Sequence, residues 1–182
     1  MKTKKIIYAL LFLLILTACD NKDEVEKIPT EAFPDLLFEK YLLQNFDSDE
    51  DGQISISEAI AVKDINCSDM RIASIKGIQY FTELVNLNCS KNEIKDFDIS
   101  KNTSIRVLDC SGSPISALSV DSFTKLQELY CSSCLLKELD LRKNKELHSL
   151  QCSGNPDLQY IYVTHNIPHK NIGNAILIYS EE

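Results

Sequence analysis

The residues best placed to do chemistry stand in the stretch DSDEDGQISISE, from Asp47 to Glu58. Carboxylates occupy its first, third, fifth and last places, and a glycine occupies the sixth. Calcium is a hard cation that takes roughly six to eight oxygen ligands, so this spacing predicts a calcium loop. The expected ligands are the side chains of Asp47, Asp49 and Asp51, the backbone carbonyl of Gln53, Ser55 directly or through water, and both oxygens of Glu58.

This stretch resembles the EF-hand loop, and its flanks predict the two helices that such a loop needs. EAFPDLLFEKYLLQNF brings Phe38, Leu42 and Phe46 to one helical face, and SEAIAV begins a second helix. Sensor EF-hands usually occur in pairs, whereas this sequence has one loop, so we expect a structural ion. The alternative is an acidic turn without metal, in which four carboxylates would repel one another.

Five Cys-Ser pairs form the second group of reactive residues. Their cysteines are separated by 22, 21, 21 and 21 residues, at Cys67, Cys89, Cys110, Cys131 and Cys152. Disulfides are one interpretation, since exported proteins favour them. Stacked strands, however, hold neighbouring Cβ atoms about 4.8 Å apart, wider than the roughly 3.8 Å of a disulfide. We therefore expect buried, reduced thiols that act as small apolar side chains.

Cys134 does not follow this spacing. It takes the place that Asn92 and Asn155 hold in other rows, where an amide would bond the backbone of the turn, and it could also reach Cys131. Cys131 and Cys134 form a lone C-x-x-C, and His165 and His169 have no acidic or cysteine partner nearby, so the sequence does not predict a zinc site.

The Cys-Ser pairs belong to a repeat, L-x-x-L-x-C-S-x-x-x-[IL]-x-x-[LFI]-x-[ILV]. Its rows begin at Val62, Leu84, Ile105, Leu126 and Leu147. The pattern resembles the short bacterial class of leucine-rich repeat, and SIKGIQYFTEL resembles the Gly-Ile segment of internalin-like repeats. The resemblance implies an α/β solenoid, an arc of parallel strands in which stacked rows bury one continuous core.

Segments outside the repeat are expected to cover the ends of this solenoid, because open ends would expose apolar side chains. Residues 30–61 are interpreted as an EF-hand-like helical cap, residues 62–163 as five leucine-rich repeats, and residues 164–182 as a C-terminal cap. Within the last segment, Ile176, Leu177 and Ile178 predict a closing strand.

The N-terminus has the pattern of an export signal. Three lysines precede an apolar run over residues 6–16, and LTAC follows, which resembles the lipobox of bacterial lipoproteins. The resemblance implies that residues 1–18 are removed and that Cys19 carries lipid, palmitate included; an ordinary cleaved signal is the alternative. Residues 19–29 would form a tether, and DNKDEVEK resembles an export tag of surface lipoproteins, which implies a surface-exposed outer-membrane lipoprotein in the bacterial envelope.

The repeat class implies binding, through side chains that alternate with the buried ones. The expected partner-binding residues are Asn86, Asn88, Asp109, Glu128, Tyr130 and Gln151, with Tyr130 as the anchor. The partner would be a protein or a glycan; alternatively, the chain is a calcium-responsive adhesin or sensor within a larger surface complex. A net charge of −8 disfavours nucleic acid. The absence of G-x-S-x-G and H-E-x-x-H motifs indicates that the chain is not an enzyme.

Overall fold

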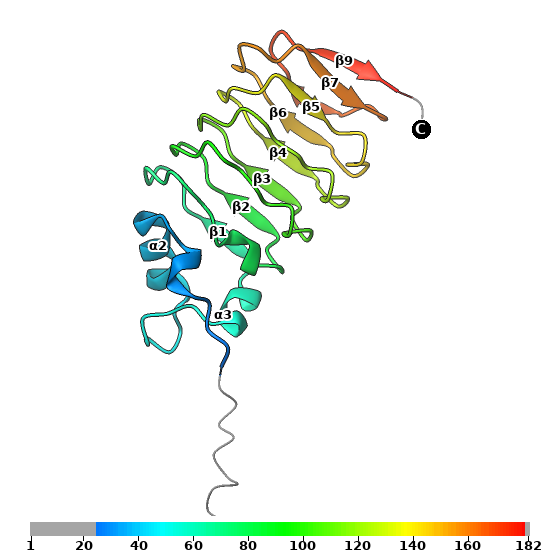
Figure 1. Ribbon diagram of the computed structural model, residues 1–182. Coiled ribbons are helices and arrows are strands. Elements are labelled where there is room, and N and C mark those ends of the chain that lie inside the picture. The colour runs from blue at the N-terminus through cyan, green and yellow to red at the C-terminus, as the bar shows by residue number, and fades with distance from the viewer. Residues whose placement is uncertain (1–24, 181–182) are drawn as a thin grey trace, which may run out of the picture.

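The computed structural model describes residues 25–180 (Figure 1). The predicted signal peptide, the lipidation site at Cys19 and the first part of the tether lie outside the described residues. Among residues 25–180, no helix has the length and apolar character needed to cross a membrane.

The body of the molecule is a solenoid with two parallel sheets (Figure 1). The first sheet has six strands in the order β1 (Asp64–Asn66), β2 (Asn86–Asn88), β3 (Val107–Asp109), β4 (Glu128–Tyr130), β6 (Ser149–Gln151) and β8 (His169–Asn171). The second sheet lies on the return leg and has three, β5 (Glu138–Asp140), β7 (Tyr160–Val163) and β9 (Ile176–Tyr179). This architecture confirms the predicted leucine-rich-repeat arc.

Each turn contributes the same kind of side chain to the core at the same place. The middle residues of the first sheet pair in register and are buried from turn to turn, at Ile65, Leu87, Leu108, Leu129 and Leu150. On the return leg, Ile94 and Ile99 are buried and Phe97 is half-buried against the same core. Because one turn could not bury these side chains alone, the stacking of turns is what stabilises the fold.

The cysteines form the predicted inward ladder. All six described cysteines are free and buried, and those of the Cys-Ser pairs are at most 1% exposed. Burial raises the pKa of Cys67 and of Cys152 to about 12, so these thiols stay protonated at neutral pH. The ladder is therefore an apolar stripe of the core.

A ladder of side-chain hydrogen bonds accompanies the cysteines at the turn that follows each strand. The Asn92 amide donates to the carbonyls of Cys67 (2.8 Å) and Cys89 (2.9 Å), and Asn155 bonds Cys131 (2.9 Å) and Cys152 (2.8 Å) in the same way. Cys134 occupies the equivalent place, and its thiol donates to the Cys110 carbonyl at 3.4 Å. A hydrogen bond with the Cys110 thiol lowers the pKa of Cys134 to about 7.

The sequence analysis missed a second ladder, in which Phe and Asn alternate every 21 residues at Phe81, Asn102, Phe123 and Asn144. All four side chains are fully buried. The Asn102 amide donates to the carbonyl of Phe81 (2.9 Å), and the Asn144 amide donates to that of Phe123 (2.8 Å). Each amide thus joins its own turn to the preceding phenylalanine turn.

The N-terminal cap consists of η1 (Thr30–Ala32), α2 (Leu36–Phe46) and α3 (Ile56–Ala61), with η2 (Ile78–Tyr80) on the first turn. Phe38 and Leu42 are fully buried and Phe46 is half-buried, which confirms the predicted apolar face. A Cβ atom on Gly77, whose φ is +103°, would lie 2.2 Å from the Phe33 ring, so this contact between cap and first turn requires glycine.

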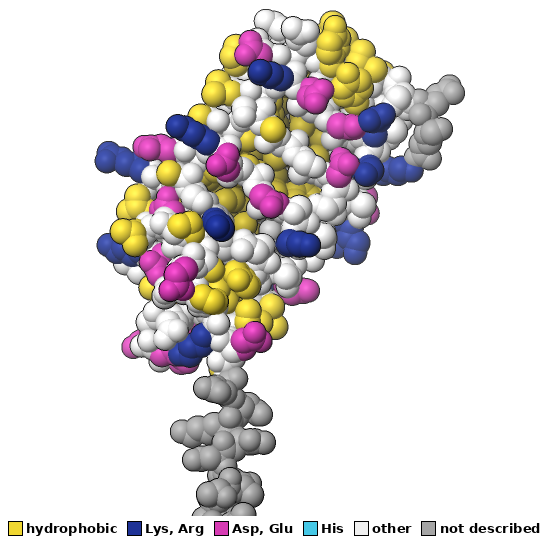
Figure 2. All heavy atoms as spheres, viewed as in Figure 1, with side chains coloured by type: hydrophobic (Ala, Val, Ile, Leu, Met, Phe, Trp, Pro, Cys, Tyr) yellow, Lys and Arg dark blue, Asp and Glu magenta, His cyan; other side chains and the backbone are white. Residues whose placement is uncertain are grey.

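The C-terminal segment continues the solenoid. β8 pairs with β6, and β9 pairs with β7 over four residues, so the expected closing strand is present at Ile176–Tyr179. Its ends are open to solvent: Ile176 is 57% and Tyr179 is 58% exposed. In Figure 2, hydrophobic side chains gather at this end of the molecule.

Candidate functional site

The acidic loop runs directly from one cap helix to the other. α2 ends at Phe46, and Asp47, the first expected ligand, is the next residue. Ser55 is the N-cap of α3, which places Glu58 in the first turn of that helix. Gly52 has a φ of +80° with open space around the position of a Cβ, so the backbone conformation alone favours glycine there.

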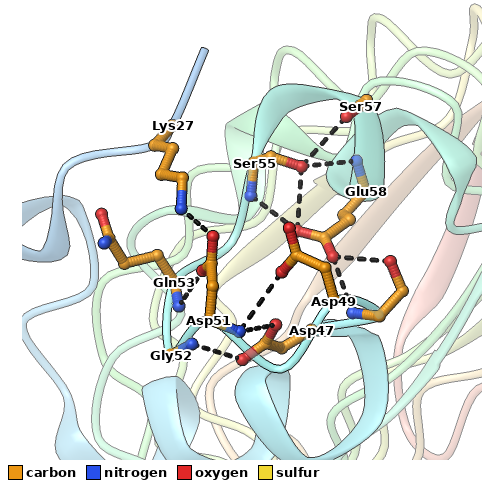
Figure 3. Close-up of polar contacts among 10 residues, drawn as sticks. Lys27, Asp47, Asp49, Asp51, Gly52, Gln53, Ser55, Ser57 and Glu58 are labelled. Carbon is orange, nitrogen blue, oxygen red and sulfur yellow. Dashed lines mark hydrogen bonds and ion pairs between the residues drawn. The ribbon is translucent and has the colours of Figure 1, made fainter. Parts of the chain in front are cut away.

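Three of the expected ligands converge. Asp47, Asp49 and Glu58 each place one carboxylate oxygen within 4.8 Å of the other two (Figure 3). Backbone amides orient the first carboxylate, since Gly52 N donates to Asp47 Oδ2 at 2.8 Å and Asp51 N donates to Asp47 Oδ1 at 3.2 Å. This set of carboxylate oxygens fits a hard divalent cation such as calcium.

Four hydrogen bonds hold the Glu58 carboxylate in place. Its Oε2 accepts hydrogen bonds from the Ser55 backbone (2.9 Å) and hydroxyl (2.8 Å), and its Oε1 accepts from the Ser48 backbone (2.6 Å) and hydroxyl (2.7 Å). Burial raises the pKa of Glu58, but these hydrogen bonds together outweigh burial and lower it to about 2. The carboxylate is therefore charged and oriented at neutral pH.

The other three expected ligands are engaged differently. The Asp51 carboxylate turns to the ammonium of Lys27 and also accepts from Gln53 N at 3.0 Å. The Ser55 hydroxyl contacts Glu58 and Ser57, and the carbonyl of Gln53 has no described contact with the cluster. Asp47, Asp49 and Glu58 are thus the carboxylates that converge, and Asp51, Gln53 and Ser55 remain predicted ligands.

Sequence reasoning missed Lys27 because it stands in the segment taken as tether. In the structure, Ile28 N donates to Ile54 O at 2.9 Å, and Ile56 N donates to Glu26 O at 2.8 Å, on either side of a bridge between Lys27 and Ser55. Ile28 is 1% exposed, so residues 26–28 are part of the cap. The apolar Ile28 before the helix was the available signal.

The expected partner-binding residues lie together on one sheet. β2, β3, β4 and β6 carry all six, and these side chains, half-buried except for the exposed Gln151, alternate with buried ones. Their polar groups are largely paired with neighbours: Tyr130 donates to Glu128 at 2.6 Å, and Asn86 donates to Asp64 at 2.5 Å. The hydrogen bond with Glu128 raises the pKa of Tyr130. These contacts fix the side chains of the face.

Serines of the Cys-Ser pairs form hydrogen bonds within the turns. The Ser90 backbone and hydroxyl both donate to Asn88 Oδ1, at 3.1 and 2.7 Å, and Ser111 N donates to Asp109 Oδ1 at 3.0 Å. The side-chain oxygens of Asn88 and Asp109 therefore hold the turns as well as facing solvent.

A hollow of about 660 Å³ lies between the acidic loop and the start of the first sheet. Its lining includes Ser48 and Glu58 from the loop region, the apolar Phe46 and Val62, and Asp64 at the start of β1. The loop and the sheet face are therefore connected by a shared surface.

Comparison with known proteins identifies the fold. No family model matches the chain, and no curated protein matches it. The functional domain of InlJ from Listeria monocytogenes, described as including a cysteine ladder, is similar with a TM-score of 0.61 and 22% identity over 77% of this chain. Internalin InlF of the same organism has a TM-score of 0.57 and 23% identity over 78% of this chain. A leucine-rich-repeat protein of Leptospira interrogans has a TM-score of 0.51 and 21% identity over 60%.

The chain spans a minor part of each of these proteins. It covers 39% of the InlJ domain, 46% of InlF and 34% of the Leptospira protein. All three are named as internalins or leucine-rich-repeat proteins, and none of these names is that of an enzyme. These likenesses concern the fold, so the chain has an internalin-like leucine-rich-repeat fold.

Proposed function

We propose that this chain is a cell-surface recognition protein that binds a partner protein through the exposed face of the six-stranded sheet. The observation that carries the proposal is the arrangement of Asn86, Asn88, Asp109, Glu128, Tyr130 and Gln151 across four neighbouring strands. Side chains fixed by mutual hydrogen bonds lose little conformational entropy on binding, which favours a specific interface. A glycan is the second partner class that such a polar face suits.

The test is capture from surface extracts with the lipid-free chain beginning at residue 20. The variant Tyr130→Ala removes the central aromatic side chain, and Tyr160→Ala is the matched control, because Tyr160 is exposed on the other sheet. We expect Tyr130→Ala to weaken capture at least about tenfold, as for an interface hot spot, and Tyr160→Ala to leave it unchanged. Equal capture by both variants, or capture of nothing, would contradict the proposal.

We infer that the acidic loop binds one calcium ion that stabilises the N-terminal cap. The convergence of Asp47, Asp49 and Glu58 supports this inference. A bound calcium ion would neutralise the negative charges of their carboxylates. Isothermal titration with calcium tests it. The variant Asp49→Asn should lose binding, while Asp98→Asn, which changes an exposed carboxylate in another turn, should keep it.

A calcium-responsive adhesin or sensor is the second candidate function. The hollow shared by Glu58, Ser48 and Asp64 favours it, because an ion in the loop would change one wall of that hollow. Partner affinity measured with calcium and with a chelator separates the candidates. A change of more than about tenfold, which is in the usual range of allosteric coupling, would indicate regulation by calcium. A smaller change would indicate a structural ion.

We also propose that lipid on Cys19 anchors the protein to the outer membrane, since LTAC has the lipobox spacing. Metabolic labelling with palmitate tests this proposal. Cys19→Ser should remove the label and move the protein to the soluble fraction. A variant that stays unlabelled in the membrane fraction would indicate another anchor.

A further inference from the structure

Lys27 contacts Asp51, the third aspartate of the loop, which the loop spacing predicts to be a metal ligand. Its ammonium forms an ion pair with Asp51, while Asp47, Asp49 and Glu58 converge without that residue (Figure 3). The backbone fixes the position of Lys27, because the hydrogen bonds of Ile28 and Ile56 hold its strand against the loop on both sides. Lys27 is therefore part of the loop structure, although it precedes the first expected ligand, Asp47, by 20 residues in the sequence.

The Asp51 carboxylate could pair with either of two positive charges, the Lys27 ammonium or a bound calcium ion. In the structure it faces Lys27, and both side chains are about one-third exposed, at 36% for Lys27 and 29% for Asp51. The spacing of the loop, however, places Asp51 among the ligands. In this arrangement Asp51 Oδ2 pairs with Lys27, Oδ1 accepts from Gln53 N, and Asp51 is not among the three converging carboxylates, so its contact with Lys27 competes with metal binding through this residue.

We propose that Lys27 is an internal competitor for the metal, which lowers the calcium affinity of the loop; this inference rests on the proposed calcium site. Without an ion, the ammonium offsets part of the repulsion among the four carboxylates of the loop and stabilises the metal-free arrangement. With an ion bound, its positive charge repels calcium. Both effects lower the calcium affinity.

Removal of this charge should therefore strengthen calcium binding. Lys27→Gln keeps most of the side-chain length without the charge, and at the distances of neighbouring side chains near a surface the electrostatic change corresponds to an affinity gain of about 5- to 30-fold. Lys27→Arg keeps the charge and should stay within about twofold of the natural chain, since both the ion pair and the repulsion of calcium depend on that charge.

The experiment is isothermal titration of calcium chloride into the lipid-free chain beginning at residue 20, at low ionic strength. The matched control is Lys143→Gln, because Lys143 also pairs with an aspartate, Asp121 at 2.9 Å, in a later turn of the solenoid. Lys143→Gln removes the same formal charge and should leave calcium affinity unchanged. An equal gain in both variants would show a general charge effect and overturn the proposal.

Thermal unfolding supplies the second measurement and separates this role from ordinary stabilisation. In a chelator, Lys27→Gln should unfold at a lower temperature than the natural chain, and added calcium should raise its midpoint by more. A lysine with a merely structural role would lower both midpoints equally. If Lys27→Gln does not fold, Lys27→Met provides the test, because it also removes the charge while keeping the apolar stem and should show the same gain in calcium affinity.

The two proposals fail in different ways. If neither the natural chain nor Lys27→Gln produces a calcium signal, the calcium site itself is wrong and this inference falls with it. If both bind calcium with equal affinity, or Lys27→Gln binds more weakly, the site stands and the competitor role is overturned.

Discussion

The two ends of the solenoid are finished in different ways. At the N-terminal end, a helical segment outside the repeat covers the first turn with Phe38 and Leu42, both fully buried. At the C-terminal end of the described residues, Ile176 and Tyr179 are more than half exposed. The described solenoid is thus covered at its first turn and open at its last described strand.

The N-terminal cap also satisfies backbone donors of the first turn. Asp35 caps α2 through Oδ1, and its Oδ2 accepts from Ala73 N (2.7 Å) and Ser74 N (3.1 Å). Tyr41 Oη accepts from Asn66 N, at the free edge of β1, at 3.0 Å. Side chains of the cap therefore replace the neighbouring strand that the first turn lacks.

The last turn uses a charge instead. Lys170 of β8 stands in register with Leu150, at the place that carries an apolar residue in every earlier strand. Its ammonium bonds the Ile167 carbonyl at 3.0 Å. A lysine on an edge strand opposes pairing with a further strand. We therefore expect the N-terminal end to contribute more to stability, and Lys170 to oppose pairing with a further strand.

The largest effect should follow from opening the covered end. Phe38→Ala removes a fully buried ring between α2 and the first turn and should cost about 3–5 kcal/mol in the free energy of unfolding. Ile176→Ala at the open end should cost less than about 0.5 kcal/mol. Urea denaturation measures both, and similar losses would contradict the comparison.

A smaller effect should follow from loss of the clamp between cap and first turn. Asp35→Ala removes a helix cap and leaves the Ala73 and Ser74 amides without their acceptor, so we expect a loss of about 1–3 kcal/mol. Asp98→Ala is the control, since Asp98 accepts from Ser100 N within its own turn. If the control costs as much, the clamp has no special role.

Calcium should stabilise the N-terminal end relative to the C-terminal end, by less than the two substitutions above destabilise the protein. Extracellular modules bind calcium with Kd values of about 10⁻⁴–10⁻³ M, so about 2 mM calcium should stabilise the protein by about 0.6–1.8 kcal/mol relative to a chelator. Hydrogen exchange should slow in residues 36–61 and stay unchanged in β9. Protection spread evenly over the chain would argue against a local site in the cap.

The smallest change in stability is expected for Lys170→Leu, within about 1 kcal/mol. Its main effect should be self-association, because the substitution completes the apolar row up to the edge strand. Light scattering after size exclusion should show a mass that rises with concentration for Lys170→Leu and constant mass for Lys143→Leu. Constant mass in both would mean that the edge is protected by other means.

The repeat, the inward cysteines and the apolar face of α2 could be predicted from the sequence, because each depends on a local period. Lys27 could not be, since its role requires a backbone pairing between residues distant along the chain. Asp51 is predicted as a ligand from its spacing alone, and spacing gives no information on its ion pair with Lys27. The alternation of phenylalanine and asparagine, as at Phe123 and Asn144, was also missed. When rows are aligned singly, the position looks variable, and the pattern appears only when rows are compared two apart.

That alternation sets a rule for how such a protein can change length. Loss or duplication of one turn would place two rings or two amides against each other, with a clash or an unfilled space as the result. Loss or duplication of two turns would restore the original neighbours. Variants shortened or extended between Phe81 and Asn144 should therefore lose or gain turns in pairs.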